Sequence, residues 1–249
     1  MSISSVCTGA ENRLRAASPP FALAWYGRLF RHRALDARWL AAGLTRNTAV
    51  EGEGAGKLRR LAGRTPDADV AELIRRHAVD ESRHALVCIA MLVTVFPSAV
   101  PADRGLSLVA LSPRYRSGDR PPPAPPISSQ RLLDEIVQMN IGEIRTRINQ
   151  LLLGPVIMAV CPRDRRRRIR RMLDSLLRDE TRHIGLTAAL LERALAGAHE
   201  AFVVRTLHGR LGQFNRRTLD EIGGSRPQPR PRGRLRWQRM PRPLRSAVI

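Results

Sequence analysis

Apolar residues recur at intervals of three and four over most of this 249-residue chain, a period typical of amphipathic α-helices. The clearest case runs from about Asp67 to Phe96, and Pro97 then ends the pattern. Similar patterns predict further helices at residues 21–32, 35–62, 128–153, 165–195 and 199–222. We therefore expect an all-α protein.

Two of these helices have features that weaken them. Glycines at positions 52, 54 and 56 occupy the middle of helix 35–62 and lower its helix propensity. In the helix that begins near residue 128, Gly154 and Pro155 either interrupt the helix or lie within an extension to Val160. The pattern leaves both alternatives open.

The helices form two pairs, separated by the Pro-rich and aperiodic segment 97–126, which we interpret as a long connection. Residues 1–34 are expected to form an N-terminal extension with a short helix, and residues 223–249 an Arg/Pro-rich disordered tail. Residues 35–222 between them are expected to form a helical bundle. The order of elements favours a four-helix bundle with one long crossover and additional flanking helices.

The composition excludes several classes of protein. The longest apolar stretch, Ala85 to Phe96, is too short to span a bilayer, and the N-terminus lacks the pattern of a signal peptide. We therefore expect a cytoplasmic protein with no membrane partner. The three cysteines, Cys7, Cys88 and Cys161, form no C-x-x-C pair, which indicates free buried thiols.

The formal net charge of +21 comes almost entirely from arginine, since Lys57 is the single lysine. Seven arginines gather within residues 163–171, and eight lie within residues 225–249. Such clusters attract nucleic acid or acidic partners. The other interpretation is a solvated helix face followed by a disordered tail.

A pentapeptide occurs twice in nearly the same form, as DESRH at residues 80–84 and as DETRH at residues 179–183. Each copy places a Glu and a His three residues apart, and on a helix these positions share a face. One such pair is a weak signal. Two copies, one in each half of the chain, indicate a duplicated metal-binding helix and favour a di-iron or di-manganese carboxylate site.

Such a site needs one further carboxylate from the partner helix of each pair, level with the motif across the hairpin. Glu51 and the first motif's Glu lie almost equally far before and after the turn at Thr65. Glu143 and the second motif's Glu have the same relation to the turn at Pro162. Glu53 competes with Glu51, and Glu135, which lies further from its turn, competes with Glu143.

This layout resembles the ferritin-like di-iron carboxylate superfamily. That superfamily includes bacterial multicomponent monooxygenases, arylamine N-oxygenases, rubrerythrins, ribonucleotide reductase small subunits and tRNA hydroxylases. The resemblance covers roughly residues 35–195, and the D-E-x-R-H form is closest to the oxygenases. Carried over by position, the six metal ligands would be Glu51, Glu81, His84, Glu143, Glu180 and His183. Among them, Glu81 and Glu180 would be candidates to bridge two metal ions.

The resemblance also implies roles for neighbouring residues. Asp80 and Asp179 would accept the second N–H of a ligand His from the opposite half of the chain, which fixes the imidazole tautomer. Arg83 and Arg182 would pair with acids around the site. His77 lies one turn before the first motif's Glu and is either an additional ligand or a hydrogen-bonded core residue.

The resemblance implies an O2-activating non-haem di-iron oxidase or oxygenase that acts on a small organic substrate and takes electrons from a donor protein or reductant. The expected cofactor is two Fe ions, with Mn/Fe or Mn/Mn as alternatives. A tRNA-hydroxylase-like enzyme would use the Arg-rich segments to bind nucleic acid. The remaining alternative is a ferritin-like protein that stores metal or handles peroxide.

Overall fold

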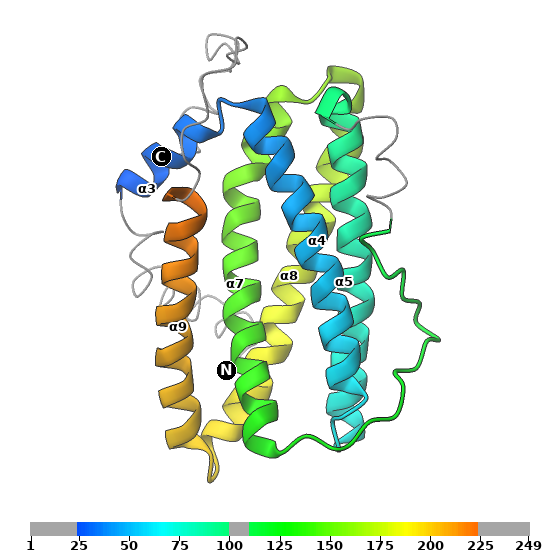
Figure 1. Cartoon of the computed structure of the whole chain (residues 1–249), viewed down its shortest axis with the longest axis vertical. Helices are drawn as coiled ribbons and strands as arrows, with labels where there is room; N and C mark the ends of the chain where they lie inside the picture. Colours follow the sequence, from blue (N-terminus) through cyan, green and yellow to red (C-terminus); the bar gives the residue numbers. More distant parts are fainter. Residues whose placement is uncertain (1–23, 100–109, 224–249) are drawn as a thin grey trace. The chain divides into compact units, whose positions relative to one another are not determined.

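The computed structural model describes residues 24–99 and 110–223 (Figure 1). Over these ranges it contains helices and no β-strand, so the expected all-α class is confirmed. Our expectations for residues 1–23, Cys7 included, and for the Arg/Pro-rich tail beyond Gly223 lie outside the described residues. The elements within the described ranges are α3 (Ala24–Arg33), α4 (Ala37–Ala62), α5 (Ala68–Val95), η1 (Pro97–Ala99), α7 (Ser129–Val160), η3 (Arg163–Arg165), α8 (Arg166–Leu195) and α9 (Glu200–Gly223).

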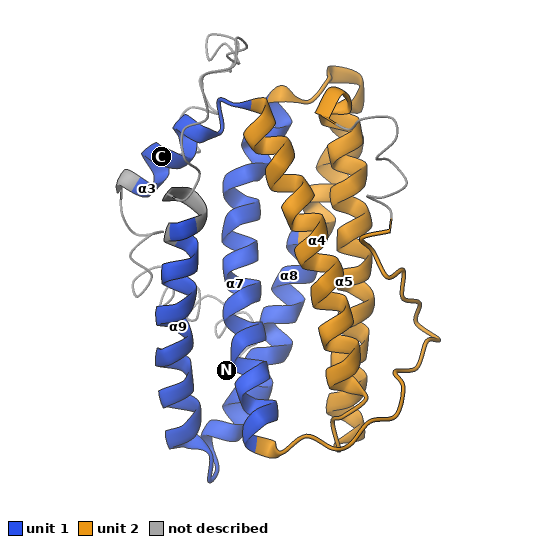
Figure 2. Cartoon of the chain, in the orientation of Figure 1, with its two compact units in different colours: residues 1–36, 130–159, 177–249 blue, residues 37–129, 160–176 orange. Residues whose placement is uncertain are grey.

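The chain divides into two compact units (Figure 2). Unit 1 comprises residues 1–36, 130–159 and 177–249, and unit 2 comprises residues 37–129 and 160–176. Helix α8 contributes its first part to unit 2 and the rest to unit 1. Each unit contains one D-E-x-R-H motif together with the carboxylate expected from its partner helix.

Unit 2 is built on a hairpin of α4 and α5, which pack against each other. The side chain of Asp67 caps α5 by accepting hydrogen bonds from the backbone N–H groups of Asp69 and Val70, both at 3.0 Å. At the other end, Phe96 donates its N–H to Leu92, and the helix stops before Pro97. Apolar side chains of both helices are buried, among them Leu40, Leu44, Leu58, Ile74, Ala85 and Leu92.

The described end of the long connection, residues 110–128, lies along this hairpin, and we call it the strap. Ser112 donates its hydroxyl to the carbonyl of Ser82 at 2.7 Å, and the hydroxyl of Ser82 accepts the N–H of Tyr115 at 2.9 Å. At Gly52 the Leu111 carbonyl oxygen lies only 1.9 Å from where a Cβ would be. The glycine that weakens α4 as a helix therefore makes room for the strap, and α4 stays unbroken.

Unit 1 contains α3, α7, most of α8 and α9. Helix α7 continues through Pro155 to Val160, so of our two alternatives the extension is the one observed. Arg210 on α9 holds Asp134 on α7 with two hydrogen bonds of 2.9 and 2.6 Å, and Arg145 donates to Thr218 at 2.8 Å. Among the residues that the structure describes, no helix is both long and apolar enough to cross a membrane.

Candidate metal centre

Unit 2 brings three of the expected ligands together at the middle of its hairpin. Glu51 projects from α4, while Glu81 and His84 lie three residues apart on one face of α5. All three are buried, and their ligand atoms lie within 4.8 Å of one another. His84 Nδ1 is 3.2 Å from Glu81 Oε1. We call this cluster the unit 2 half-site.

Glu81 stands at the centre of this cluster. Burial alone would raise its pKa, but hydrogen bonding with Glu51, His77 and His84 outweighs burial and holds the pKa well below its usual range. Two buried carboxylates this close repel each other unless a proton or a cation lies with them. Glutamate oxygens and an imidazole nitrogen form a donor set that fits iron or manganese.

His77 lies one helical turn before Glu81. Its Nε2 is 3.4 Å from Glu81 Oε1, and its side chain is buried. His77 therefore reaches the half-site through Glu81. This position suits a hydrogen-bonded core histidine and also lies within reach of a metal ion held by Glu81.

The structure separates the two candidate ligands on α4. Glu51 is 8% exposed, whereas Glu53 is exposed and lies outside the cluster. Next to Glu53, Gly54 lies close to Glu81, since a Cβ there would make an ordinary contact of 3.8 Å with Glu81 Oε2. Glu51 is thus the α4 carboxylate that the geometry places with Glu81.

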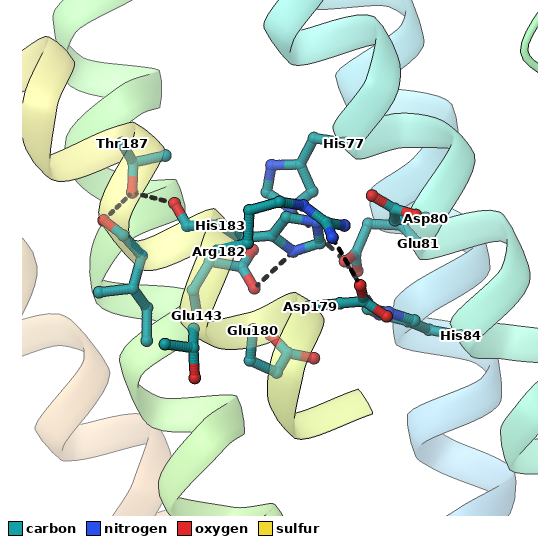
Figure 3. A network of polar contacts seen from close by, with 12 residues as sticks. His77, Asp80, Glu81, His84, Glu143, Asp179, Glu180, Arg182, His183 and Thr187 are labelled. Atoms are coloured by element: carbon teal, nitrogen blue, oxygen red, sulfur yellow. Dashed lines mark hydrogen bonds and ion pairs between the residues drawn. The ribbon is translucent and has the colours of Figure 1, made fainter. Parts of the chain in front are cut away.

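Unit 1 holds the second set of expected ligands in a different arrangement. His183 Nδ1 lies 3.7 Å from Glu143 Oε2 (Figure 3). Glu180 is fully buried, and its Oε1 accepts a hydrogen bond from Gln150 Nε2 at 3.0 Å. Among the described residues of this unit, no third His, Cys, Asp or Glu completes a close group with Glu143 and His183. We call Glu143, Glu180 and His183 the unit 1 half-site.

The alternative carboxylate on α7 has another partner. Glu135 pairs with Arg131 on its own helix, with 3.4 Å between Arg131 Nε and Glu135 Oε1, and its side chain is 34% exposed. Glu143, by contrast, is 12% exposed and faces His183. The structure therefore places Glu143 at the half-site and Glu135 away from it.

Polar residues that the motif pattern does not single out join α7 to α8 beside this half-site. Asn140 Nδ2 donates to Thr187 Oγ1 at 2.9 Å and to the Ile184 carbonyl at 3.3 Å. Thr187 in turn donates to the His183 carbonyl at 2.8 Å (Figure 3). Helical spacing alone indicates that both residues share a face with a ligand, because Asn140 lies three residues before Glu143 and Thr187 lies four residues after His183. Gln150, seven residues after Glu143, follows the same face.

The aspartate and arginine of each motif pair along their own helix. Arg83 lies 3.5 Å from Asp80, and Arg182 lies 2.9 Å from Asp179 (Figure 3). Both arginines thus contact an acid beside the site, as the sequence suggested. The role of the two aspartates as acceptors for a histidine of the other half stays a prediction.

No family model, curated protein or solved structure matches this chain. Function is therefore inferred from the two half-sites themselves. The two buried glutamates and the buried histidine of the unit 2 half-site could hold a metal ion, and Glu143 and His183 of unit 1 are also among the residues that could.

Proposed function

We propose that this chain is an O2-activating di-iron oxidase or oxygenase that acts on an organic substrate. One observation carries the proposal: each unit contains a Glu from one helix and a Glu-x-x-His from the next, and these ligand side chains are largely buried. This is the ligand pattern of di-metal carboxylate proteins. The finer fold, a ferritin-like four-helix bundle with one long crossover, belongs to the same proposal and is supported by the order of helices along the chain.

The chemistry of the donors supports iron. Carboxylate and imidazole ligands with open coordination positions suit non-haem iron that reacts with oxygen. Two bound Fe ions would supply the electrons and the binding position for O2, and a reductant would restore them. The four glutamates would neutralise the cations, and the two histidines would bind them through neutral nitrogens.

The protein around each half-site would keep water away from this chemistry. Cys88 lies one turn after His84 and is buried, and burial together with the charges of Glu51 and Glu81 raises the pKa of its thiol. Its buried side chain would therefore contribute to the protein wall beside the unit 2 half-site. In unit 1, Ile144, which follows Glu143 in sequence, is 3% exposed and would add an apolar side chain near the half-site.

Iron content and oxygen reactivity test the proposal directly. The full chain would be purified from iron-supplied cells, its iron measured, and the anaerobically reduced protein mixed with O2 in a stopped-flow spectrometer. We expect about two irons per chain, the number held by di-iron carboxylate sites, and a transient near-ultraviolet or visible band. No bound metal after anaerobic reconstitution would overturn the proposal.

Iron uptake and tRNA binding distinguish this proposal from the two alternatives that the sequence leaves open. Uptake of iron far beyond two ions per chain on repeated oxidation would instead indicate a storage protein. Tight and salt-sensitive binding of tRNA by the iron-loaded protein would redirect the substrate assignment to RNA.

A further inference from the structure

Unit 2 has a pocket on the side of α4 that the strap covers, formed by residues that are not candidate metal ligands. Its volume is about 470 Å³, which lies within the range of small-molecule binding sites. The lining residues are Gly56, Arg59, Arg60, Tyr115, Arg120 and Pro122. Three of these six residues are arginines, and none is acidic.

The positive charge of this pocket has no acidic partner among the described residues. Arg60 and Arg120 are exposed, and neither guanidinium makes a hydrogen bond or ion pair within the described part of the chain. The nearest acid on the strap, Asp119, is engaged by its own turn, since its Oδ2 accepts the N–H of Arg116 at 2.8 Å. Glu53 on α4 is exposed and does not line the pocket.

The strap fixes the wall of the pocket. Arg59 donates to the Arg120 carbonyl at 2.6 Å, and its guanidinium carbon lies 4.5 Å from the centre of the Tyr115 ring. The backbone of Tyr115 is itself held by Ser82 on α5. These contacts orient one arginine and one aromatic ring before any ligand arrives, so less side-chain freedom is lost on binding.

Gly56 provides the floor of the pocket. A Cβ at this position would lie 3.5 Å from the Arg60 guanidinium and 3.9 Å from the Tyr115 hydroxyl. Both distances are ordinary contacts, so Gly56 lies close to the Arg60 guanidinium and to the Tyr115 hydroxyl. A larger side chain would fill the space beside them and leave every charge in place.

We propose that this pocket binds a small molecule that carries a phosphate group. Arg60 and Arg120 donate to the phosphate oxygens, and the fixed Arg59 adds charge from the wall. Guanidinium groups match phosphate oxygens with paired hydrogen bonds, and a doubly charged phosphate balances more of the arginine charge than a carboxylate does. The Tyr115 hydroxyl supplies a further polar contact at the floor. This site is independent of the metal centre, because the two share no residue.

Tyrosine NMR gives a readout specific to this pocket. The chain contains two tyrosines, Tyr115 in the pocket and Tyr26, which is buried in unit 1. Full-length protein with ring-labelled tyrosine would be titrated with adenosine 5′-monophosphate and, separately, with inorganic phosphate. The signal lost in Tyr115→Phe assigns the spectrum. We expect saturable movement of the Tyr115 signal while the Tyr26 signal stays in place.

Two variants and a control distinguish a specific phosphate site from non-specific electrostatic attraction to a basic protein. The double variant Arg60→Ala with Arg120→Ala should weaken binding at least about tenfold, because two charged hydrogen-bond donors are lost. Gly56→Leu keeps the charge and should abolish the Tyr115 shift. Arg193→Ala removes an exposed arginine elsewhere and should leave binding unchanged.

The relative affinities for the two probes identify the ligand chemistry. Equal affinity for both probes identifies free phosphate as the ligand chemistry, and tighter binding of the nucleotide identifies an organic phosphate. An unmoved Tyr115 signal, or the same binding curve in Gly56→Leu as in the unchanged chain, would overturn the proposal.

Discussion

The two half-sites contain the same ligand types, yet the polar neighbours of their central glutamates differ. In unit 2, His77 contacts Glu81 from the preceding turn of the same helix. Four residues before Glu180, the corresponding position is the buried Leu176, and Glu180 instead accepts a hydrogen bond from Gln150 on α7. The α4 position that corresponds to Gln150 is the buried Leu58.

The ligands of the two half-sites are also arranged differently. Glu81 is grouped with Glu51 and His84, so unit 2 presents three ligands together. Glu180 accepts a hydrogen bond from Gln150, while His183 lies beside Glu143. The repeated motif thus sets the ligand types, while residues outside the motif supply different polar neighbours to the two carboxylates.

The largest effect should come from removing the central carboxylate of either half-site. Glu81→Ala should lower the iron content from about two per chain to about one or fewer, since it removes the residue that the other ligands contact. Glu180→Ala should do the same in unit 1. Metal analysis and circular dichroism check this, with Glu53→Ala and Glu135→Ala as controls that keep their iron. Full retention of iron in Glu81→Ala would remove Glu81 from the site.

Two glycines beside the α4 and α7 ligands should respond in opposite directions. Gly52→Ala places a Cβ 1.9 Å from the Leu111 carbonyl oxygen and should destabilise the protein by about 1–3 kcal/mol. Gly142→Ala meets no atom within 4 Å and should stabilise α7 by up to about 1 kcal/mol. Calorimetric melting temperatures measure both. Equal melting temperatures for the two variants would mean that the strap does not pack on Gly52.

Replacing Gln150 tests what holds Glu180. Gln150→Leu introduces the residue found at the corresponding position of α4 and removes the 3.0 Å hydrogen bond to Glu180. Because partners that orient a ligand support metal affinity, iron binding by unit 1 should weaken by about 10–100-fold. Competition with a chelator measures the change. Tighter binding would show that Gln150 keeps Glu180 away from the metal.

Removing the polar neighbour of Glu81 in unit 2 should have a smaller effect on iron binding. His77→Leu introduces the residue found at position 176, but Glu81 keeps its contacts with Glu51 and His84. Iron content should stay near two per chain, and affinity should fall by about tenfold or less. Loss of a whole iron would instead identify His77 as a ligand, and His77→Gln would then restore less than full binding.

The smallest effect concerns an ion-pair cluster on α5. Hydrogen bonds from Arg75 and Arg76 lower the pKa of Glu72 to about 2. A lowered folded-state pKa gives stability that is present above the ordinary value of 4.5 and is lost as the pH falls towards 2. Because the Glu72 side chain is 39% exposed, solvent screening should keep the loss below about 1 kcal/mol. Urea unfolding across this pH range should show it, and Glu72→Gln should remove it.

Much of the helical organisation follows from the sequence. The three-and-four periodicity located every described α-helix to within a few residues, apart from the extension of α7, since burial of one face is a local property of the pattern. The sequence does not decide whether Pro155 ends the helix. A proline removes one backbone hydrogen bond, and packing of the rest of the helix can offset that loss. Hairpin symmetry likewise led to Glu51 and Glu143, which the structure places beside Glu81 and His183.

The neighbours of the ligands were harder to predict. Gln150, Asn140 and Thr187 act across two helices, and their pairing depends on the relative rotation of those helices, which periodicity does not fix. The strap was predicted only as an irregular connection, because its contacts with Gly52 and Ser82 join segments that are far apart in sequence.

The strap also has a consequence for how the protein is made. Translation proceeds from the N-terminus, and the three ligands of the unit 2 half-site and the strap that braces their hairpin all lie within the segment 37–129. They leave the ribosome before His183 is synthesised. The order of synthesis therefore gives the nascent chain one assembled set of metal ligands while the second set is still incomplete.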